Sequence, residues 1–365
     1  MAESASVAAA APTAHAAIDW AALVTSLRAG RDLAPGQASE AMRAMLAGGF
    51  DESVVEAMLV ALHAKGERGP ELRAMLEVAL AACRRVPLEA GLAARTIDVV
   101  GTGGDRSHSV NVSTMAALVV SACGVPVCKH GSRAATSRCG SADVLEALGV
   151  PVGIPPEDVA RRVASTGFGF CLATTHHPAF AAVAPVRRRI PTPTVFNLIG
   201  PMANPAPVGA MVLGVRAPSL AEPMLEALEV RGLRRTWVVH GEGGLDEASL
   251  AGPTTIVARE GGATRTWTIV PEDAGLARAT LDDVRGGDPA DNARAVEALC
   301  RGERGPVRDI VVLNAAIALV VADAAGDVRE GARIAGDAID DGRAAARLAR
   351  MREAVAPAAT AGAAS

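Results

Sequence analysis

The chain has 365 residues with 36 basic and 40 acidic side chains, which gives a formal net charge of −4. This length is typical of about two domains, and a hydrophobic content of 50% excludes wholesale disorder. Only 2% of the residues are aromatic and Tyr is absent. A core of Ala, Val, Leu and Ile favours packed helices and parallel strands over an aromatic-rich β-sandwich.

Charge and cysteine usage narrow the class of protein further. Nucleic-acid-binding proteins cluster Lys and Arg against phosphates, whereas the only lysines of this chain are Lys65 and Lys129. The six cysteines form no C-x-x-C pair, which is typical of reduced thiols in a cytoplasmic protein. The Ala-rich start has no basic region, and the longest uncharged window contains Gly and Pro. We therefore expect neither a signal peptide nor a membrane span.

The N-terminal part of the chain has the periodicity of helices only. After a disordered, Ala-rich tail over residues 1–15, we expect a helical domain over residues 16–90, and a Pro-rich segment near 191–207 is expected to return to it. The pattern predicts four helices. In the first, Ile18, Ala21, Val24 and Leu27 share a face; the second carries Met42, Met45 and Leu46; the third has Asp51 as its N-cap; the fourth begins at Gly69-Pro70 and runs through Cys83.

From Thr96 the pattern changes to strands that alternate with helices, so we expect an α/β domain over residues 91–350, followed by a disordered tail over 351–365. A strand at 97–100, a helix at 113–122 and a strand at 125–128 predict a parallel sheet with right-handed crossovers. Further strands are expected at 168–173, 212–215 and 236–240, and late helices at 292–300 and 309–322.

Glycine-rich and basic segments follow the first two predicted strands. Gly101-Thr102-Gly103-Gly104-Asp105 leads to Asn111-Val112-Ser113-Thr114, where glycine amides and a helix N-terminus favour an anion. Lys129-His130-Gly131-Ser132-Arg133 adds positive charge, and Ser137 and Ser141 add hydroxyls. Because the carboxyl ends of parallel strands bind ligands in such sheets, the two segments favour a phosphate site. The alternatives are a tight turn with an Asx cap and a solvated basic turn.

Two further segments carry charge. Arg187-Arg188-Arg189 follows His176-His177; three arginines are usually an exposed helix face, but one of them can clamp a carboxylate. The histidine pair lacks zinc-ligand spacing. Gly243-Gly244-Leu245-Asp246-Glu247 suits Mg²⁺, which is held by one or two carboxylates plus phosphates, although an acidic helix N-cap is the commoner outcome. Together the four segments indicate a Mg²⁺–diphosphate substrate beside a second, acidic substrate.

In this order, the motifs resemble those of the anthranilate phosphoribosyltransferase family. The resemblance covers roughly residues 16–350, and it also includes Gly140-Ser141-Ala142-Asp143, Phe196-Asn197-Leu198-Ile199-Gly200-Pro201 and Leu313-Asn314-Ala315-Ala316. It implies a small all-helical domain hinged to a larger α/β domain with a mostly parallel central sheet, and a homodimer joined through the helical domains. The implied reaction joins the amine of anthranilate to C1 of phosphoribosyl pyrophosphate (PRPP) and releases pyrophosphate, in tryptophan biosynthesis.

The resemblance also implies roles for individual residues. Lys129, Asp246 and Glu247 would be catalytic; Ser113, Asp246 and Glu247 would hold Mg²⁺; Gly101, Ser132 and Arg187 would face anthranilate. The residues implied to surround PRPP are Gly101, Gly104, Asp105, Ser109, Asn111, Val112, Ser113, Thr114, Lys129, His130, Gly131, Ser132, Arg133, Ala134, Ala135, Thr136, Ser137 and Ser141. No nucleic-acid or membrane partner is implied.

Some positions depart from the family pattern. Arg106 stands where the family has Gly, Ser132 where it has Asn, and Arg189 and Pro191 where it has Glu and Gly. The shorter reach of Ser132 is expected to weaken the hold on anthranilate. Three alternatives remain open: a transferase of the same fold with another aromatic acid as acceptor, a nucleoside phosphorylase, which Asp246-Glu247 disfavours, and a non-catalytic nucleic-acid-binding relative, which would need a basic groove.

Overall fold

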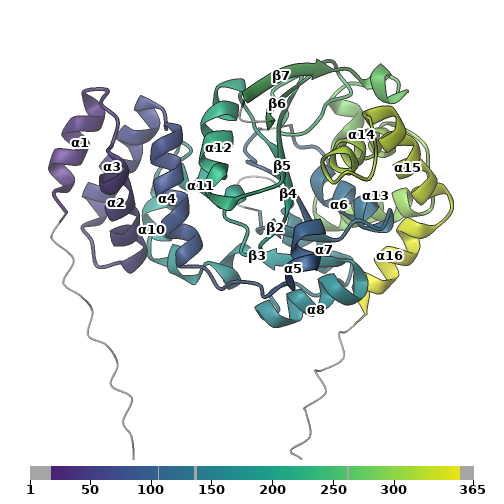
Figure 1. Ribbon diagram of the computed structural model, residues 1–365, viewed down its shortest axis with the longest axis horizontal. Coiled ribbons are helices and arrows are strands. Elements are labelled where there is room, and N and C mark those ends of the chain that lie inside the picture. Colours follow the sequence, from purple (N-terminus) through teal and green to yellow (C-terminus); the bar gives the residue numbers. More distant parts are fainter. Residues whose placement is uncertain (1–17, 106, 135–137, 261–262, 354–365) are drawn as a thin grey trace, which may run out of the picture.

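The computed structural model describes residues 18–105, 107–134, 138–260 and 263–353. A helical bundle lies beside a larger α/β body (Figure 1). The expected tail over residues 1–15 lies outside the described residues, as do Arg106, Ala135, Thr136 and Ser137. At the other end, Met351 and Arg352 belong to the last helix, so the ordered chain extends slightly further than expected.

Four helices form the start of the bundle, as predicted. They are α1 (Trp20–Arg28), α2 (Pro35–Ala47), α3 (Glu52–Lys65) and α4 (Gly69–Ala81). Asp51 caps α3, because its carboxylate accepts a hydrogen bond from the Ser53 amide at 2.8 Å. The buried face of α1 contains Leu23 with Val24 and Leu27, whereas Ala21 is exposed. The expectation for Ala21 was therefore wrong, because the larger Leu23 takes the core position.

The chain returns to the bundle after the third strand of the sheet, earlier than the predicted 191–207 segment. The returning elements are the 3₁₀ helix η1 (Pro178–Ala182), α10 (Ala184–Arg189) and α11 (Val195–Met202). Val186, Phe196 and Ile199 share one hydrophobic core with the helices of the bundle. The apolar side chains of α10 and α11 thus belong to the bundle, although the segment lies far along the chain.

In the described part of the chain, seven strands form one sheet in the order β3-β2-β1-β4-β5-β6-β7. The strands are β1 (Ile97–Gly101), β2 (Val127–Gly131), β3 (Phe168–Leu172), β4 (Ala210–Gly214), β5 (Arg235–Gly241), β6 (Thr254–Glu260) and β7 (Ala263–Ile269). The first five are parallel, and β6 and β7 add an antiparallel edge. The mostly parallel sheet is confirmed, but the β6–β7 hairpin was not predicted. The second strand begins at Val127, after Pro126, which has no amide to pair.

Both faces of the sheet are covered, as continuous apolar strands require. Val99, Val212 and Val239 pack into one core, and their neighbours Val100, Leu213 and Val238 pack into the core of the bundle. The first face carries α6 (Val112–Ala122), α13 (Pro289–Cys300), α14 (Pro306–Val321), α15 (Val328–Asp340) and α16 (Arg343–Arg352), and α12 (Ala221–Ala227) joins the second face to α4 (Figure 1). The remaining helices are α5 (Ala90–Arg95), α7 (Ser141–Ala147), α8 (Pro156–Thr166) and α9 (Ala173–His176).

The late helices begin about one turn before the predicted positions. α13 starts at Pro289 after Asp288, whose carboxylate accepts a hydrogen bond from Asp291 at 2.9 Å, and α14 starts at Pro306. Proline is tolerated in the first helical turn because its missing amide would have no partner there.

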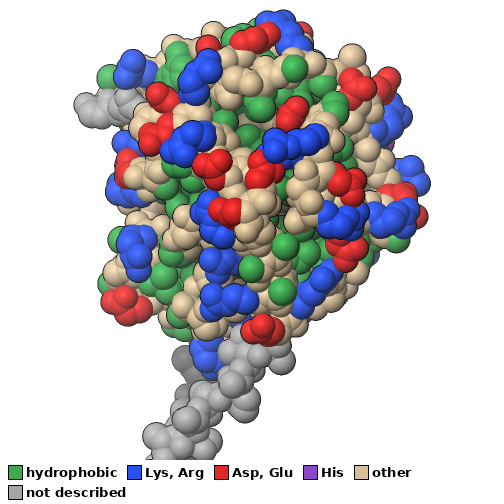
Figure 2. Space-filling view, turned by 90° about the vertical axis from the view of Figure 1, so that its right-hand side faces the viewer, with side chains coloured by type: hydrophobic (Ala, Val, Ile, Leu, Met, Phe, Trp, Pro, Cys, Tyr) green, Lys and Arg blue, Asp and Glu red, His purple; other side chains and the backbone are tan. Residues whose placement is uncertain are grey.

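Three further features concern the apolar helices, the cysteines and the surface charge. No helix in the described ranges is long and apolar enough to cross a bilayer. All six cysteines lie in the described residues and none forms a disulfide, although the Sγ atoms of Cys128 and Cys171 are 3.5 Å apart. On the side where α15 and α16 lie, basic and acidic side chains intermingle over most of the surface (Figure 2).

Candidate functional site

An acidic loop, residues 245–249, lies across the carboxyl ends of three neighbouring parallel strands. The strands β1, β4 and β5 end in Gly101, Gly214 and Gly241. A Cβ atom on Gly101 or Gly214 would collide with Asp246, and one on Gly241 would collide with the carbonyl oxygen of Glu247. Each strand ends in glycine because the loop passes too close for any side chain. This is also the point where the strand order reverses around β1, which is where such sheets bind ligands.

Asp246 and Glu247 point toward the loop after β1 and the start of α6. The Oδ2 atom of Asp246 accepts a hydrogen bond from the Gly103 amide at 2.5 Å, and Oε1 of Glu247 accepts one from the Ser113 amide at 3.1 Å. Burial, together with the negative charge of Asp105, raises the pKa of Asp246 to about 7. Burial and the charge of Asp246 raise the pKa of Glu247 to about 8. Burial and the neighbouring carboxylates therefore favour the protonated form of both side chains.

Lys129 supplies the cation beside this pair from the middle of β2. Its side chain is 1% exposed, and its ammonium group donates to the Val99 carbonyl at 2.5 Å and to Oγ of Ser113 at 3.1 Å. Burial lowers the pKa of Lys129, and the charges of Asp98, Glu247 and Asp246 oppose that shift. The structure thus brings Lys129, Ser113 and Glu247 together, as the sequence predicted.

The glycine loop after β1 is open to solvent at its tip. Gly103 and Gly104 are exposed and have φ angles of 67° and 74°, a left-handed conformation that glycine adopts without strain. Asp105 accepts a hydrogen bond from the Ser107 amide at 3.3 Å, and Ser109 forms a β-bridge with Arg285. The tip of the loop therefore faces solvent, while main-chain hydrogen bonds fix its second half to residues 284–286.

The loop leads into α6, where four predicted phosphate-binding residues are adjacent. Asn111 is the N-cap, followed by Val112, Ser113 and Thr114, and the Asn111 side-chain amide donates to the Cys139 carbonyl at 3.2 Å. Val112 and Thr114 are buried, so only their main-chain groups are available to a ligand. The Ser113 hydroxyl is the side-chain group that faces Lys129.

The segment after β2 is exposed at Ser132, Arg133 and Ala134. Arg133 forms an ion pair with Glu146, and the Ala134 amide donates to Asp143 at 2.8 Å. Ser141 begins α7 and lies against Gly131, where a Cβ would approach Ser141 to 3.0 Å. Ala135, Thr136 and Ser137 lie outside the described residues.

Arg187 lies at the end of a row of aromatic rings that begins beside Lys129. His130 and His177 have ring centroids 5.1 Å apart, Phe180 follows at 4.9 Å from His177, and Phe196 at 5.4 Å from Phe180. The Arg187 guanidinium lies 5.1 Å from the Phe196 ring centroid, a cation–π distance.

Some polar atoms of this row lack partners in the described part of the chain, although Nε2 of His177 lies 2.8 Å from the Ala203 carbonyl oxygen. Burial lowers the pKa of Arg187, and this guanidinium makes no ion pair within the described residues. In the same part of the chain, Nε2 of His130 and Nδ1 of His177 are buried without a hydrogen-bond partner. Buried polar atoms without partners are uncommon in folded proteins, and a water, an ion or a ligand can satisfy them. The other two arginines differ, because Arg188 is exposed and Arg189 pairs with Glu52 and Glu56 on α3.

Sequence reasoning did not assign a role to several residues that build this site. Gly214 and Gly241 admit the acidic loop, Asn314 on α14 holds it, and His177 and Phe196 connect Arg187 to β2. In the sequence, Gly214 and Gly241 each stand at the end of an apolar run, and this position was the signal that could have identified them. Asn314 and Phe196 were within the quoted motifs, but their contacts are set by the tertiary fold.

The donors around the acidic loop fit a magnesium ion. Asp246 and Glu247 are adjacent carboxylates with raised pKa values, and the Ser113 hydroxyl lies on the same side of the site. Within the described residues, no group of three or more His, Cys, Asp or Glu side chains can hold a metal alone. This agrees with Mg²⁺, which takes one or two protein carboxylates and completes its shell with substrate phosphates and water.

Comparison with known proteins shows to which family the chain belongs. Residues 93–345 match the model of the glycosyl transferase family α/β domain, and residues 21–83 match its helical bundle domain. An anthranilate phosphoribosyltransferase of Methylocella silvestris is 48% identical over 332 residues, which cover 91% of this chain and 94% of the relative. The chain belongs to the anthranilate phosphoribosyltransferase family. It is therefore a pentosyltransferase, as the motifs predicted.

Solved structures of the family share the fold. The anthranilate phosphoribosyltransferase of Thermus thermophilus superposes with a TM-score of 0.84 at 42% identity, over 90% of this chain and 98% of that one. The enzyme of Saccharomyces cerevisiae in complex with PRPP and Mg has a TM-score of 0.83 at 26% identity, over 91% and 96% of the two chains. The helical domain and the mostly parallel α/β domain expected from the sequence are thus confirmed.

Proposed function

We propose that the carboxyl edge of the sheet binds PRPP and Mg²⁺, and that the row of rings ending at Arg187 binds anthranilate. The reaction transfers the phosphoribosyl group from PRPP to the anthranilate amine and gives N-(5-phosphoribosyl)anthranilate and pyrophosphate. The observation that carries the assignment is the pair of adjacent carboxylates, buried Asp246 and half-buried Glu247, which face the glycine loop and the N-terminus of α6.

Ser113, Asp246 and Glu247 are the residues that hold Mg²⁺. When bound, the ion neutralises the charge that develops on the departing pyrophosphate. The glycine turn at Gly103 and Gly104 and the N-terminus of α6 bind phosphate oxygens, because glycine admits close approach and the positive end of the helix dipole favours an anion. The remaining residues around PRPP are those given above from the resemblance, with Ala135, Thr136 and Ser137 outside the described residues.

Lys129 stabilises the leaving group beside the metal ligands. Its ammonium group is buried and fixed by Val99 and Ser113, so it is already oriented before the reaction begins. The anthranilate amine is unprotonated near neutral pH, so the site needs no strong base. The work of the residues is therefore to bind both substrates in line and to stabilise the departing pyrophosphate.

Arg187 pairs with the carboxylate of anthranilate. The Arg187 guanidinium is half-buried and has no ion pair within the described residues, so it can bind a carboxylate strongly. Phe196 and Phe180 offer apolar surface to an aromatic ring. Gly101 and Ser132 complete the proposed set around the acceptor. His130 on β2 and His177 connect this end of the site to the strand, and Nε2 of His130 and Nδ1 of His177 are buried without a partner in the described residues.

The test follows anthranilate fluorescence in a mixture of the protein, PRPP and Mg²⁺. We expect a loss of fluorescence that requires Mg²⁺ and is abolished in Asp246→Ala. Arg187→Ala is expected to raise the KM for anthranilate while the KM for PRPP is unchanged, since Arg187 lies at the acceptor end. Turnover without Mg²⁺, or full activity in Asp246→Ala, would overturn the assignment.

Two further proposals concern the oligomeric state and the cellular location of the protein. We propose a homodimer joined through the helical domains, where α3 exposes Val60 at 43%, a large hydrophobic side chain left uncovered in the described single chain. Sedimentation of the full chain tests this. We also propose a cytoplasmic location, since six cysteines without a disulfide persist most readily in a reducing compartment.

A further inference from the structure

We propose that Asn314 is a positioning residue that fixes the metal-binding carboxylates through the main chain of Ala248. The proposal rests on the function proposed above for Asp246 and Glu247. Asn314 is on α14 and is 3% exposed. It touches neither carboxylate, and its contacts are with the residue that follows Glu247.

The side-chain amide of Asn314 pairs with both polar groups of Ala248. Its Oδ1 atom accepts a hydrogen bond from the Ala248 amide at 2.8 Å, and its Nδ2 atom donates to the Ala248 carbonyl at 3.0 Å. The second Nδ2 hydrogen is donated to the Ile310 carbonyl at 2.9 Å, one turn earlier on α14. The amide is thus fully used, and its orientation is fixed by the helix that carries it.

The other sides of the acidic loop are already fixed. Gly101, Gly214 and Gly241 form a floor that the loop touches through Asp246 and Glu247. Gly241 and Leu245 exchange main-chain hydrogen bonds of 2.9 and 3.2 Å at the start of the loop, and the Ser249 amide donates to the Thr254 hydroxyl at 3.0 Å at its end. Asn314 is the contact from the helical layer, directly after the two carboxylates.

The same helix also supports the opposite side of the site. α14 packs along α6, and the Ser113 amide near the start of α6 donates to Glu247. α14 therefore sets both the place of the carboxylates and the place of the helix that faces them. Removing the amide would leave the buried amide and carbonyl of Ala248 without partners, and the loop would relieve this by shifting.

The experiment compares Asn314→Leu, which removes both contacts to Ala248, with the unchanged protein. We expect the uptake of Mg²⁺ with PRPP, measured by titration calorimetry, to weaken by about tenfold or more, as for other residues that orient metal ligands. The Mg²⁺ concentration for half-maximal activity should rise in parallel. The KM for anthranilate should be unchanged, because Arg187 and Phe196 lie on α10 and α11.

Two variants separate positioning from a merely structural role. Leu319→Ala creates a cavity on the same buried helix and lowers Tm, but it leaves the pairing with Ala248 intact, so Mg²⁺ uptake should be unchanged. Asn314→Ser is too short to reach Ala248 and adds no buried charge, so a loss similar to that of Asn314→Leu is expected. It also provides the test if Asn314→Leu does not fold.

Asn314 variants that lose Tm but take up Mg²⁺ and PRPP like the unchanged protein would overturn the positioning role. A protein that binds PRPP equally well without Mg²⁺, or an Asp246→Ala variant that keeps its Mg²⁺ dependence, would instead overturn the function proposed for the acidic pair. The two failures are therefore distinguishable.

Discussion

Asp246 and Glu247 are adjacent carboxylates beside the positive charge of Lys129. Their pKa values, raised to about 7 and about 8, mean that the free protein holds protons there near neutral pH. An unfolded chain would have released those protons already, since free carboxyls titrate near pH 4. These two groups therefore make the folded protein less stable as pH rises from about 4 to about 8.

A pH prediction follows for the binding of the metal. Mg²⁺ needs both carboxylates deprotonated, so its uptake with PRPP should weaken as pH falls below about 8 and protons should be released on binding at pH 7. Calorimetry in two buffers with different ionisation enthalpies measures the released protons. Binding that is independent of pH between 6 and 9 would contradict the raised pKa values.

A second prediction at this scale concerns Ser132, which is exposed at the end of β2. Its hydroxyl reaches less far than the Asn side chain of other family members. Ser132→Asn is expected to lower the KM for anthranilate by about fivefold, the worth of roughly one additional hydrogen bond. Steady-state kinetics with varied anthranilate checks this, and the KM for PRPP is the internal control. An unchanged KM for anthranilate would show that Ser132 does not limit the acceptor.

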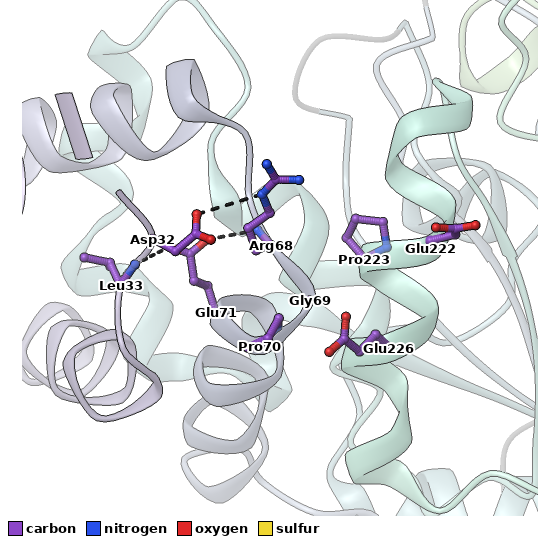
Figure 3. A pocket seen from close by; sticks show the side chains of 9 residues that line it. All are labelled: Asp32, Leu33, Arg68, Gly69, Pro70, Glu71, Glu222, Pro223 and Glu226. Atoms are coloured by element: carbon purple, nitrogen blue, oxygen red, sulfur yellow. Dashed lines mark hydrogen bonds and ion pairs between the residues drawn. The ribbon is translucent and has the colours of Figure 1, made fainter. Parts of the chain in front are cut away.

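At the scale of elements, the N-terminal turn of α4 is hydrogen-bonded to other segments of the helical bundle, and α4 packs against α12. Glu71 is 1% exposed, and its carboxylate accepts hydrogen bonds from the Leu33 amide at 2.7 Å and the Arg68 amide at 2.9 Å (Figure 3). Lys65 donates to it at 2.8 Å. Glu222 and Glu226 of α12 line a cavity of about 340 Å³ together with Gly69 and Pro70. These residues are drawn in Figure 3, and the Glu226 carboxylate leaves no room for a Cβ on Gly69.

Glu71→Ala should lower the free energy of unfolding by about 3 kcal/mol, because it leaves a buried amide and the Lys65 ammonium without this partner. Glu77→Ala is the matched control on the same helix, since Glu77 is exposed and pairs only with Arg73 at 3.5 Å. Only a small loss is expected for it. Urea denaturation of both variants measures the difference, and equal losses would show that the buried network contributes little.

At the scale of the whole molecule, the returning segment ties the bundle to the substrate strands. Asp98 on β1 accepts hydrogen bonds from the His130 amide at 3.2 Å and the Asn204 side chain at 2.8 Å. Asn204 also donates to the Cys128 carbonyl at 2.8 Å, and Arg231 binds the Asn204 carbonyl at 2.6 Å. These hydrogen bonds connect the segment after α11 to β1 and β2. A ligand that binds at the ends of these strands therefore stabilises the returning segment as well as the sheet.

Ligand binding should therefore stabilise the whole chain. With Mg²⁺ and PRPP at about one hundred times their Kd, the folded state gains about 2.7 kcal/mol, and a thermal melt should show a higher Tm. Chelation of Mg²⁺ is expected to remove the gain. PRPP that raises Tm equally in the presence of a chelator would show that the acidic pair is not the metal site.

Much of the fold could be predicted because its signals are local. Four apolar stripes predicted the helices of the bundle, and glycine-rich turns after short apolar runs predicted the parallel strands. The β6–β7 hairpin escaped prediction, since β7 is exposed along most of its length and has no continuous apolar run. The starts of α13 and α14 were placed too late because the proline at each start was not used.

The sequence by itself determined the chemistry of this protein: the family, the glycine loops, Lys129 and the Asp246-Glu247 pair are all read from adjacent residues. Only the tertiary structure decided how these groups are arranged. Three strand-end glycines admit the acidic loop, Asn314 holds it from a helix 66 residues away in sequence, and a row of rings connects Arg187 to β2. The physical reason is that composition and spacing act along the chain, whereas close approach and buried hydrogen bonds form between segments that only folding brings together.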